Sequence, residues 1–372
     1  MDIFEQTSKQ LVLFFILYGI TGIVPLLGAF YLLLRRANAF APGVTPPVRL
    51  RRWAAAFFVV ASFAHVWWLL FYLYSGDLQS VAYMMIVMLD CVLLATTFAG
   101  MLLAMLQDRR RSVWPAPVLM IPFVVLEVVY MVNHRFLIIQ IAFIYLLSLS
   151  LLFTAYMIVS IRQYERWLND NYADLENKRV WLSQMVSLVC MLLFVLYALA
   201  TDWVLIWLMH IIALLLFGLL LWRVETLPYL PVREGSKDSQ GQEQEDELSA
   251  PRGGAGGETV DLDYMSGLLQ QHCIVPQLYL QHDLSLQQLA HAIGTNRSYL
   301  SQYFSRQGIT YNTYINNLRI NHFISRYQEL AAAGQPIVAQ QLASESGYRS
   351  YSTFSLAFKQ RTGQSVTAWM RE

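Results

Sequence analysis

Long apolar stretches alternate with short polar joints over the first 222 residues of the chain. A helix needs about 20 apolar residues to cross the hydrocarbon core of a bilayer. Because every backbone amide in hydrocarbon needs an internal partner, uninterrupted stretches of this kind form helices. Seven stretches approach the required length: Leu11–Leu34, Trp53–Tyr74, Val81–Leu106, Trp114–Val132, Phe136–Ile161, Val180–Ala200 and Trp203–Trp222. They predict an all-α N-terminal bundle of seven transmembrane helices.

Basic residues are concentrated in alternate joints between these stretches. One set of joints carries thirteen of them: Arg35, Arg36, Arg49, Arg51, Arg52, Arg109, Arg110, Arg111, Arg162, Arg166, Lys178, Arg179 and Arg223. The other joints and the N-terminus carry only Lys9 and Arg135. Because cytoplasmic loops hold the excess of Lys and Arg, we expect an outside N-terminus and a cytoplasmic C-terminus. The protein is thus expected to be a multi-pass protein of the inner (cytoplasmic) membrane.

Composition agrees with this prediction. The 372 residues are 56% hydrophobic and 14% charged, whereas a soluble domain is about 45–50% apolar and about 25% charged. A single soluble globule, a disordered chain and a fibrous protein are therefore excluded. The cysteines, Cys91, Cys190 and Cys273, are too few and too scattered for a disulfide scaffold or a paired-cysteine metal site.

Beyond residue 222 the pattern changes twice. Residues 223–260 are rich in Gly, Gln, Glu and Ser, which predicts a flexible acidic cytoplasmic linker. Amphipathic patterning returns at Asp261. The expected parts are a membrane domain at 1–222, the linker at 223–260 and a soluble domain at 261–372. The linker has an expected r.m.s. span on the order of 30–35 Å and is too soft to transmit a small helix rotation.

The soluble domain contains a duplicated helix-turn-helix pattern. In the first copy, apolar residues at helical spacing (Leu286, Leu289, Ala290 and Ile293) precede Gly294, and Asn296 is a suitable N-cap for a second helix that buries Leu300, Tyr303 and Phe304. In the second copy Leu342, Gly347, Phe354 and Phe358 match Leu289, Gly294, Leu300 and Phe304, and Ser350 takes the position of Asn296. Between the copies, Tyr314, Leu318, Phe323 and Tyr327 predict one long joining helix.

Residues 285–372 resemble the C-terminal DNA-binding domain of the AraC/XylS family of bacterial transcription regulators. The resemblance rests on the first copy, on Leu318–Arg319 in the joining helix, and on the LAxxxGY and FK elements of the second copy (Leu342–Tyr348 and Phe358–Lys359). Val366 stands where the family usually has a proline, and Leu356 where a polar or basic residue is more usual. The family places the second helix of each copy in successive major grooves, which agrees with the ~34 Å repeat of B-DNA.

The resemblance implies a role for individual side chains. By position, the residues that would face base edges are Ser298, Ser301, Gln302, Tyr351, Ser352 and Ser355. Those that would hold phosphates are Arg297, Arg306, Arg349, Lys359 and Arg361. From residue 261 onward eight basic residues face six acidic ones, so we expect weak, salt-sensitive binding by one copy and a homodimer on double-stranded DNA.

Ionisable residues inside the predicted spans are candidates for sensing. Asp90 and Glu127 either form a ligand- or proton-sensing site or fix helix packing as protonated carboxyls. Structural packing is favoured for His65 and His210, because no spacing suggests a metal. The joint at 162–179 is either an amphipathic helix that lies on the headgroups or pairs with a second copy, or a solvated connector.

These features predict a membrane-anchored transcription regulator whose membrane domain senses an unknown ligand or signal. Signalling is expected to act through pairing of membrane domains or through proteolytic release. A transporter or channel with an appended regulatory domain is the alternative, although no inverted repeat is evident. A retinal photoreceptor is excluded, since no lysine lies in a span. No catalytic motif, metal site or cofactor is expected.

Overall fold

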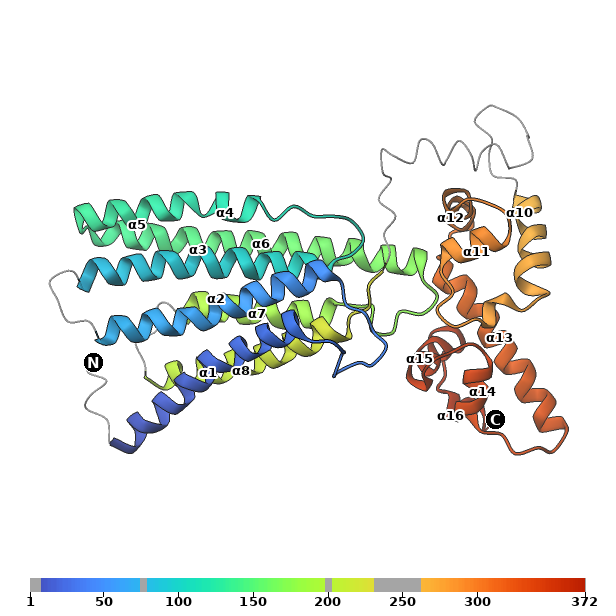
Figure 1. Ribbon diagram of the computed structural model, residues 1–372. Helices are drawn as coiled ribbons and strands as arrows, with labels where there is room; N and C mark the ends of the chain where they lie inside the picture. The colour runs from blue at the N-terminus through green and yellow to red at the C-terminus, as the bar shows by residue number, and fades with distance from the viewer. Residues whose placement is uncertain (1–7, 74–78, 198–202, 231–261, 372) are drawn as a thin grey trace, which may run out of the picture. The chain divides into compact units, whose positions relative to one another are not determined.

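A computed structural model describes residues 8–73, 79–197, 203–230 and 262–371 (Figure 1). The described residues form helices and no strand, with one isolated antiparallel bridge between Tyr172 and Ser285, so the predicted all-α class is confirmed. The chain divides into two compact units. The first comprises Met1–Arg162 and Val180–Val232, and the second comprises Gln163–Arg179 and Arg233–Glu372.

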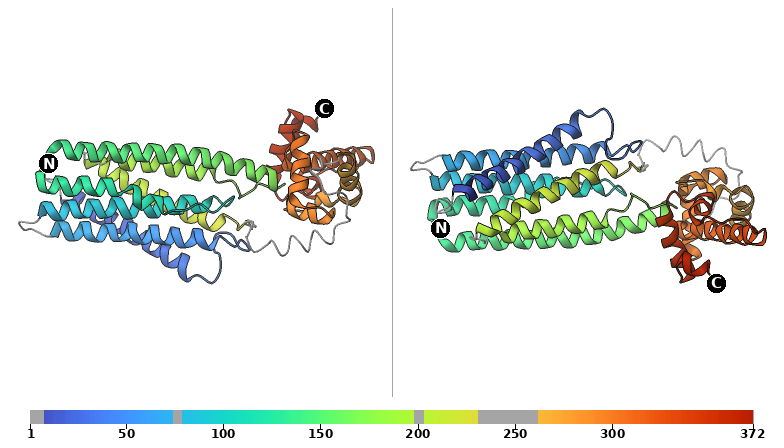
Figure 2. Two further views of the ribbon diagram at one scale, coloured as in Figure 1. Left: turned by 90° about the horizontal axis from the view of Figure 1, so that it is seen from above. Right: turned by 90° about the horizontal axis from the view of Figure 1, so that it is seen from below.

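The first unit contains the N-terminal apolar helices, whose long axes run side by side (Figure 2). Among the described residues, six helical segments are long and apolar enough to cross a membrane. They are α1 (Ser8–Leu34), α2 (Val48–Leu73), α3 (Gln79–Met105), α4 with α5 (Pro115–Leu119 and Ile121–Asn133), α6 (Phe136–Asn171) and α8 (Trp203–Thr226). The remaining predicted span forms α7 (Trp181–Tyr197), an apolar helix with 17 described residues; residues 198–202, which include the end of that span, lie outside the described part.

The fourth predicted span is divided in two by its prolines. α4 ends at Leu119, and α5 begins at Ile121 with Pro122 in its first two positions. Proline has no backbone N–H, and its ring clashes with the carbonyl four residues earlier, which interrupts helix hydrogen bonding at this point. Met120 between them keeps right-handed helical angles, so the two pieces continue as one apolar segment.

The start of the predicted linker at Arg223 is placed too early. α8 continues to Thr226, and Arg223 and Glu225 are buried within the first unit. Glu225 pairs with Arg35 at 3.1 Å, so its charge is balanced inside the unit. Gln107 then fixes the residues after the helix: its Nε2 donates to the carbonyl of Pro228, and the N–H of Leu230 donates to its Oε1. The rest of the predicted linker, 231–260, lies outside the described residues.

The second unit contains the two predicted helix-turn-helix copies. α10 (Leu262–Leu269), a π-helical turn (Gln270–Ile274) and a 3-10 turn (Leu278–Leu280) lead into them. The first copy consists of α11 (Leu286–Ala292) and α12 (Arg297–Arg306), and the second consists of α14 (Ala339–Glu345) and α15 (Tyr351–Thr362), followed by α16 (Val366–Trp369). α13 (Tyr311–Ala332) is the predicted joining helix.

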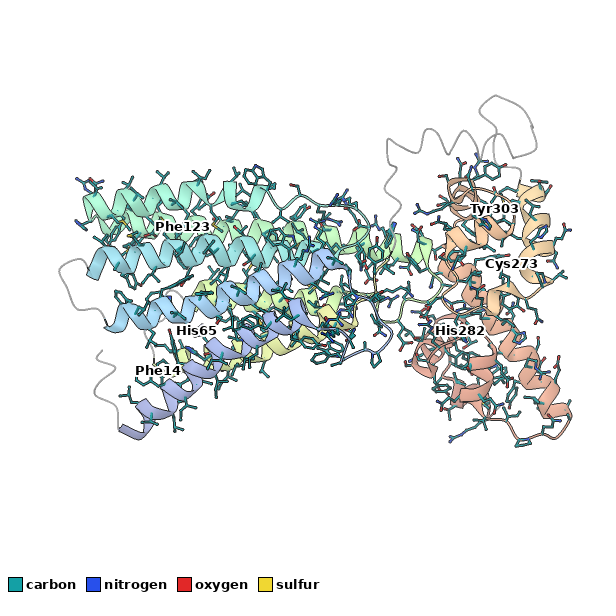
Figure 3. All side chains as sticks on the ribbon, in the orientation of Figure 1. Phe14, His65, Phe123, Cys273, His282 and Tyr303 are labelled. Atoms are coloured by element: carbon teal, nitrogen blue, oxygen red, sulfur yellow. The ribbon has the colours of Figure 1, made fainter. Side chains whose placement is uncertain are left out.

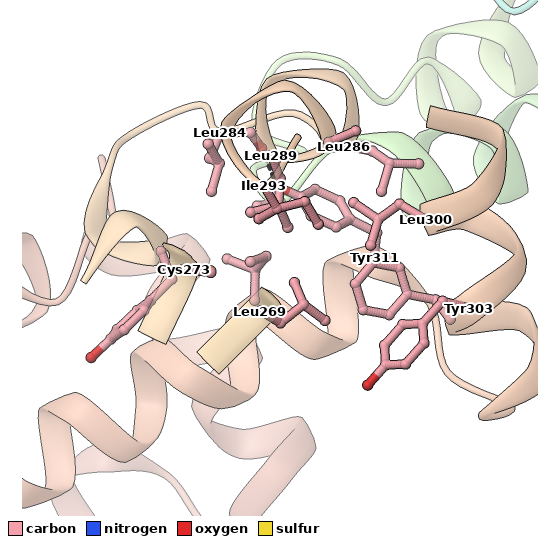
Figure 4. Close-up of a cluster of buried hydrophobic side chains, with 14 of the residues drawn as sticks. Leu269, Cys273, Leu284, Leu286, Leu289, Ile293, Leu300, Tyr303 and Tyr311 are labelled. Atoms are coloured by element: carbon pink, nitrogen blue, oxygen red, sulfur yellow. Dashed lines mark hydrogen bonds between the residues drawn. The ribbon is translucent and has the colours of Figure 1, made fainter. Parts of the chain in front are cut away.

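Each copy has its own apolar core. Leu289, Ile293 and Leu300 lie in the first core together with Tyr303 and Tyr311 (Figure 4). Cys273 is fully buried in the same cluster, and burial raises the pKa of its thiol to about 11, so it is a small apolar filler. In the second core Phe323 of α13 contacts the rings of Phe354 and Phe358, with centroids 4.4 and 5.7 Å apart. α13 therefore contributes side chains to both cores.

A buried arginine joins α13 to both copies. Arg319 is 1% exposed; its Nε donates to the carbonyl of Tyr279 at 2.7 Å, and a terminal nitrogen donates to the carbonyl of Gln281 at 2.8 Å. Its guanidinium also lies 5.5 Å from the ring centre of Tyr348, in the second copy. Burial lowers the pKa of Arg319, and the nearby Tyr348 opposes that shift. The two carbonyls and the ring compensate for removing this charge from water.

Gly347 allows this close approach. Its φ of +88° lies in the left-handed region, and a Cβ at this position would be 2.8 Å from the carbonyl oxygen of Leu280 and 3.0 Å from Arg319 Nε. Only glycine avoids both problems. Gly294, its counterpart in the first copy, also has a positive φ, +73°, which confirms that both glycines make the turns between paired helices.

We predict that Arg319→Ala destabilises the second unit by roughly 3 kcal/mol, because two buried carbonyls lose charge-assisted hydrogen bonds. Hydrogen exchange of α13 and α14 amides in the purified full-length protein measures this change. The control is Arg326→Ala on the same helix, where an exposed ion pair with Glu329 should contribute less than about 1 kcal/mol. Equal protection in the two variants would contradict the role assigned to Arg319.

Candidate nucleic-acid interface

α12 presents a polar face that is available for contact with DNA. Asn296 caps the helix by accepting from the N–H of Tyr299 at 2.7 Å, which fixes the position of its first turn. Leu300, Tyr303 and Phe304 face the core. The three predicted base-reading residues, Ser298, Ser301 and Gln302, are on the other side: Ser298 and Gln302 are exposed and Ser301 is partly exposed.

α15 repeats this arrangement with a less polar face. Ser350 caps it through the N–H of Thr353, as predicted from its match to Asn296, and Phe354 and Phe358 are buried. Of the predicted base-reading residues on this helix, Ser352 is exposed, while Tyr351 and Ser355 are partly exposed. Leu356 is 51% exposed, so an apolar side chain suited to a thymine methyl lies on the outer surface.

The five predicted phosphate-binding residues differ in what they contact. Arg306 and Lys359 are exposed in the last turns of their helices, and Arg361 donates to Asn321. Arg349 forms an ion pair with Asp283 at 2.5 Å, and Arg297 donates to Asn171 at 2.8 Å. Three of the five cations are thus engaged by other side chains of the second unit.

Residues 171–178, here called the docking segment, belong to the second unit because they pack on the helix-turn-helix copies. The segment begins at Asn171, the last residue of α6. Ala173 is 2% exposed within the core of the first copy, and its N–H donates to the carbonyl of Leu284. Asn312 of α13 donates to the carbonyls of Tyr172 and Ala173 at 3.1 and 2.6 Å. These are backbone and core contacts of the kind found inside a domain.

The docking segment also reaches both candidate reading helices. Asn171 accepts from Arg297 at the start of α12, and Glu176 accepts from the hydroxyl of Thr353 in α15 at 3.2 Å. Lys178 pairs at 3.1 Å with Asp283, the same carboxylate that binds Arg349. Neither interpretation of the joint at 162–179 included this packing. The polar residues 169–178 alone give no periodic signal that would reveal it.

Asp90 and Glu127 have different surroundings in the first unit. Asp90 of α3 accepts from the indole N–H groups of Trp67 and Trp68 in α2, at 2.7 and 2.6 Å. Glu127 of α5 is 3% exposed, and one of its oxygens has no hydrogen-bond partner among the described residues. No hydrogen bond joins the two carboxyls in that part of the chain. Asp90 therefore links two helices, while Glu127 keeps an unused acceptor.

The two predicted packing histidines lie close together. The rings of His65 (Figure 3) and His210 are 5.9 Å apart, and the ring of Tyr18 lies 4.9 Å from that of His65. Each histidine Nδ1 lies 2.8 Å from the carbonyl four residues earlier in its own helix. Within the described residues no group of three or more potential metal-binding side chains occurs.

Comparison with known proteins identifies one part of the chain. Residues 289–372 match a family model described as "Helix-turn-helix domain". No curated protein and no solved structure matches the chain significantly. The matched region contains both helix-turn-helix copies and α13, and its type is that of the AraC regulators. Residues 289–372 are therefore a DNA-binding helix-turn-helix domain of the AraC type.

Proposed function

We propose that the protein is a membrane-anchored transcription regulator that binds promoter DNA through its two helix-turn-helix copies. The observation that carries the proposal is the pair of capped helices, α12 and α15, fixed on α13 in a chain whose N-terminal helices are apolar. Two rigidly joined reading helices suit successive major grooves of B-DNA. The matched helix-turn-helix family supports the DNA-binding part of the proposal.

We assign each side chain a part of the DNA according to its exposure. Gln302 and Ser298 read base edges in one groove, and Gln302 suits the N6 and N7 atoms of adenine. Ser301 contributes to the same base-reading face of α12. The corresponding face of α15 consists of Tyr351, Ser352, Ser355 and Leu356. Arg306 and Lys359 hold phosphates at the helix ends. Three further cations do so when released from their present partners: Arg297, Arg349 and Arg361.

The docking segment is the proposed connection between the membrane helices and the reading helices. α6 runs continuously from the first unit into the second, so this connection is a helix followed by a packed segment and does not depend on the predicted linker. Asn171 accepts a hydrogen bond from the guanidinium of Arg297, the group that is proposed to bind phosphate. The docking segment and DNA therefore compete for at least one side chain, and a signal that displaces α6 favours binding. Pairing of two copies in the membrane would add to the affinity through local concentration.

Gln302→Ala should alter the DNA sequence that the protein selects. Replacing Gln302 removes a proposed base contact worth about 1–3 kcal/mol, whereas Arg306→Ala removes a proposed phosphate contact. Selection from a random DNA pool by full-length protein in lipid nanodiscs measures the effect. We expect a relaxed consensus for Gln302→Ala, and for Arg306→Ala an unchanged consensus with weaker, less salt-dependent binding. An unchanged consensus for Gln302→Ala would contradict the base-reading role.

Residue accessibility should follow the proposed orientation. In a chain without its natural cysteines, Asn133→Cys at the end of α5 should react with a membrane-impermeant thiol reagent added to intact cells. Ser112→Cys, in an arginine-rich joint, should react only after the membrane is opened. Labelling of both positions in intact cells, or of Ser112→Cys alone, would contradict the orientation.

Weakening the docking segment should strengthen DNA binding. The combined variant Asn171→Ala and Glu176→Ala removes both side-chain contacts to the reading helices but keeps Ala173 and the backbone bonds. Two hydrogen bonds of about 0.5–1.5 kcal/mol each, about 1–3 kcal/mol together, predict binding by the full-length protein that is tighter by roughly five- to 150-fold. Asp170→Ala is the control, since it removes the same charge as Glu176→Ala from an exposed neighbouring position. Unchanged or weaker DNA binding by the double variant would contradict competition between the docking segment and DNA.

A further inference from the structure

A cavity of about 620 Å³ opens in the first unit among α2, α3, α4 and the joint before α4. Its volume is within the range of sites that bind small molecules. The lining residues are Arg49, Trp53, Thr96, Arg110, Arg111, Ser112, Val113, Trp114 and Pro117. They include three guanidinium groups and no carboxylate, beside two indole rings and other apolar side chains. The lining therefore combines positive charge with apolar surface.

One wall of the cavity is held in place by close packing. The ring of Trp53 packs directly against Gly100 of α3, where a Cβ would be 2.4 to 2.7 Å from three indole carbons. No other amino acid at position 100 would leave the ring where it is. Trp53 lies one helical turn after Arg49 in α2, so this packing also fixes the part of α2 that carries Arg49. The wall that α2 and α3 form is thus fixed by packing.

Polar atoms at the cavity are buried without partners. Arg111 is 5% exposed; its two terminal nitrogens bind Asp108 at 2.5 and 2.9 Å, but its Nε has no hydrogen-bond partner. The hydroxyl of Thr96 is also buried and unpartnered. Arg49 donates to the carbonyl of Arg111. A buried N–H and a buried hydroxyl that lack acceptors cost free energy unless a ligand supplies them.

The charge around the cavity favours an anion. Asp108 balances Arg111, whereas Arg110 is exposed and forms no ion pair with any described residue. An acidic headgroup can accept from several guanidinium N–H donors at once, as phosphates and carboxylates do in proteins. The part of a ligand next to its headgroup would find apolar contact with Trp53, Val113 and Trp114.

We propose that this cavity binds the anionic headgroup of an amphiphile, a phosphate or carboxylate carried on a hydrocarbon chain. Arg49, Arg110 and Arg111 bind the headgroup, Thr96 and Ser112 provide hydroxyl groups, and the two indoles cover the start of the chain. The cavity lies in an arginine-rich joint, which the proposed orientation places at the cytoplasmic face, so the ligand comes from the cytoplasmic leaflet or the cytoplasm. Only this last point rests on the proposed function.

Native mass spectrometry of the detergent-solubilised full-length protein tests the proposal, with dimyristoyl phosphatidylglycerol, dimyristoyl phosphatidylcholine and myristate as probes. We expect one saturable site for at least one anionic probe, with at least about tenfold preference over phosphatidylcholine. Binding of phosphatidylglycerol alone identifies a membrane lipid as the source, and binding of myristate alone identifies a free amphiphile. Equal binding of all three probes would overturn the proposal.

Two variants assign the site to the cavity. Arg110→Gln removes the exposed cation, and Ser112→Asp adds an anion while keeping an acceptor for the N–H of Trp114. Each variant should weaken binding of the anionic probe about tenfold or more. Arg36→Gln is the control, since it removes the same charge from an exposed residue of another arginine-rich joint. If Arg36→Gln weakens binding as much as Arg110→Gln, the preference is a general effect of charge and the cavity is not the site. DNA binding plays no part in this test, so its outcome is separate from that of the regulator proposal.

Discussion

The guanidinium of Arg319 is the interaction on which the helix-turn-helix domain depends. It is fully buried and binds the carbonyls of Tyr279 and Gln281 that precede the first copy, while its face lies against Tyr348 of the second. A buried charge is tolerated only where its donors are used, so this side chain specifies one arrangement of the segments around it. Because α13 contributes side chains to both cores, the relative position of α12 and α15 follows from that arrangement.

The docking segment changes the route that the sequence predicted between the N-terminal apolar helices and the helix-turn-helix copies. A flexible linker can transmit a signal only by changing local concentration or by being cut. A helix that ends in a segment packed against both reading helices can transmit displacement directly. Ala173 in the first core and Asn312 on the segment backbone make the packing part of the domain. Residues 261–372 alone are therefore an incomplete unit, lacking one of their own core residues.

The sequence predicted those features that depend on local periodicity and on repeated spacing. Leu289, Gly294, Leu300 and Phe304 recur in the second copy, and the helices, caps and glycine turns appear where that repeat places them. Arg319 was visible as part of the resemblance, but its partners are 38 to 40 residues earlier in the chain, and no local pattern reveals such a contact. The docking segment was missed for the same reason, since its contacts cross more than 100 residues.

In the N-terminal apolar part, apolar length predicted the helices but not their ends. α8 extends past Arg223 because Glu225 finds a partner in Arg35, nearly 200 residues away, so a charge that marks a boundary in sequence is neutralised in the fold. The cavity at Arg110 was invisible for a related reason. Its arginines appear in the sequence only as an orientation signal, and their convergence with Trp53 depends on the packing of that ring against Gly100.

The central claim is that α12 and α15 enter two successive major grooves while the chain is held in a membrane. Hydroxyl-radical footprinting of DNA bound to the full-length protein in nanodiscs tests it most directly. The account predicts two protected patches on one face of the duplex, centred about 10–11 base pairs apart. A single patch, or two patches on opposite faces of the duplex, would contradict it.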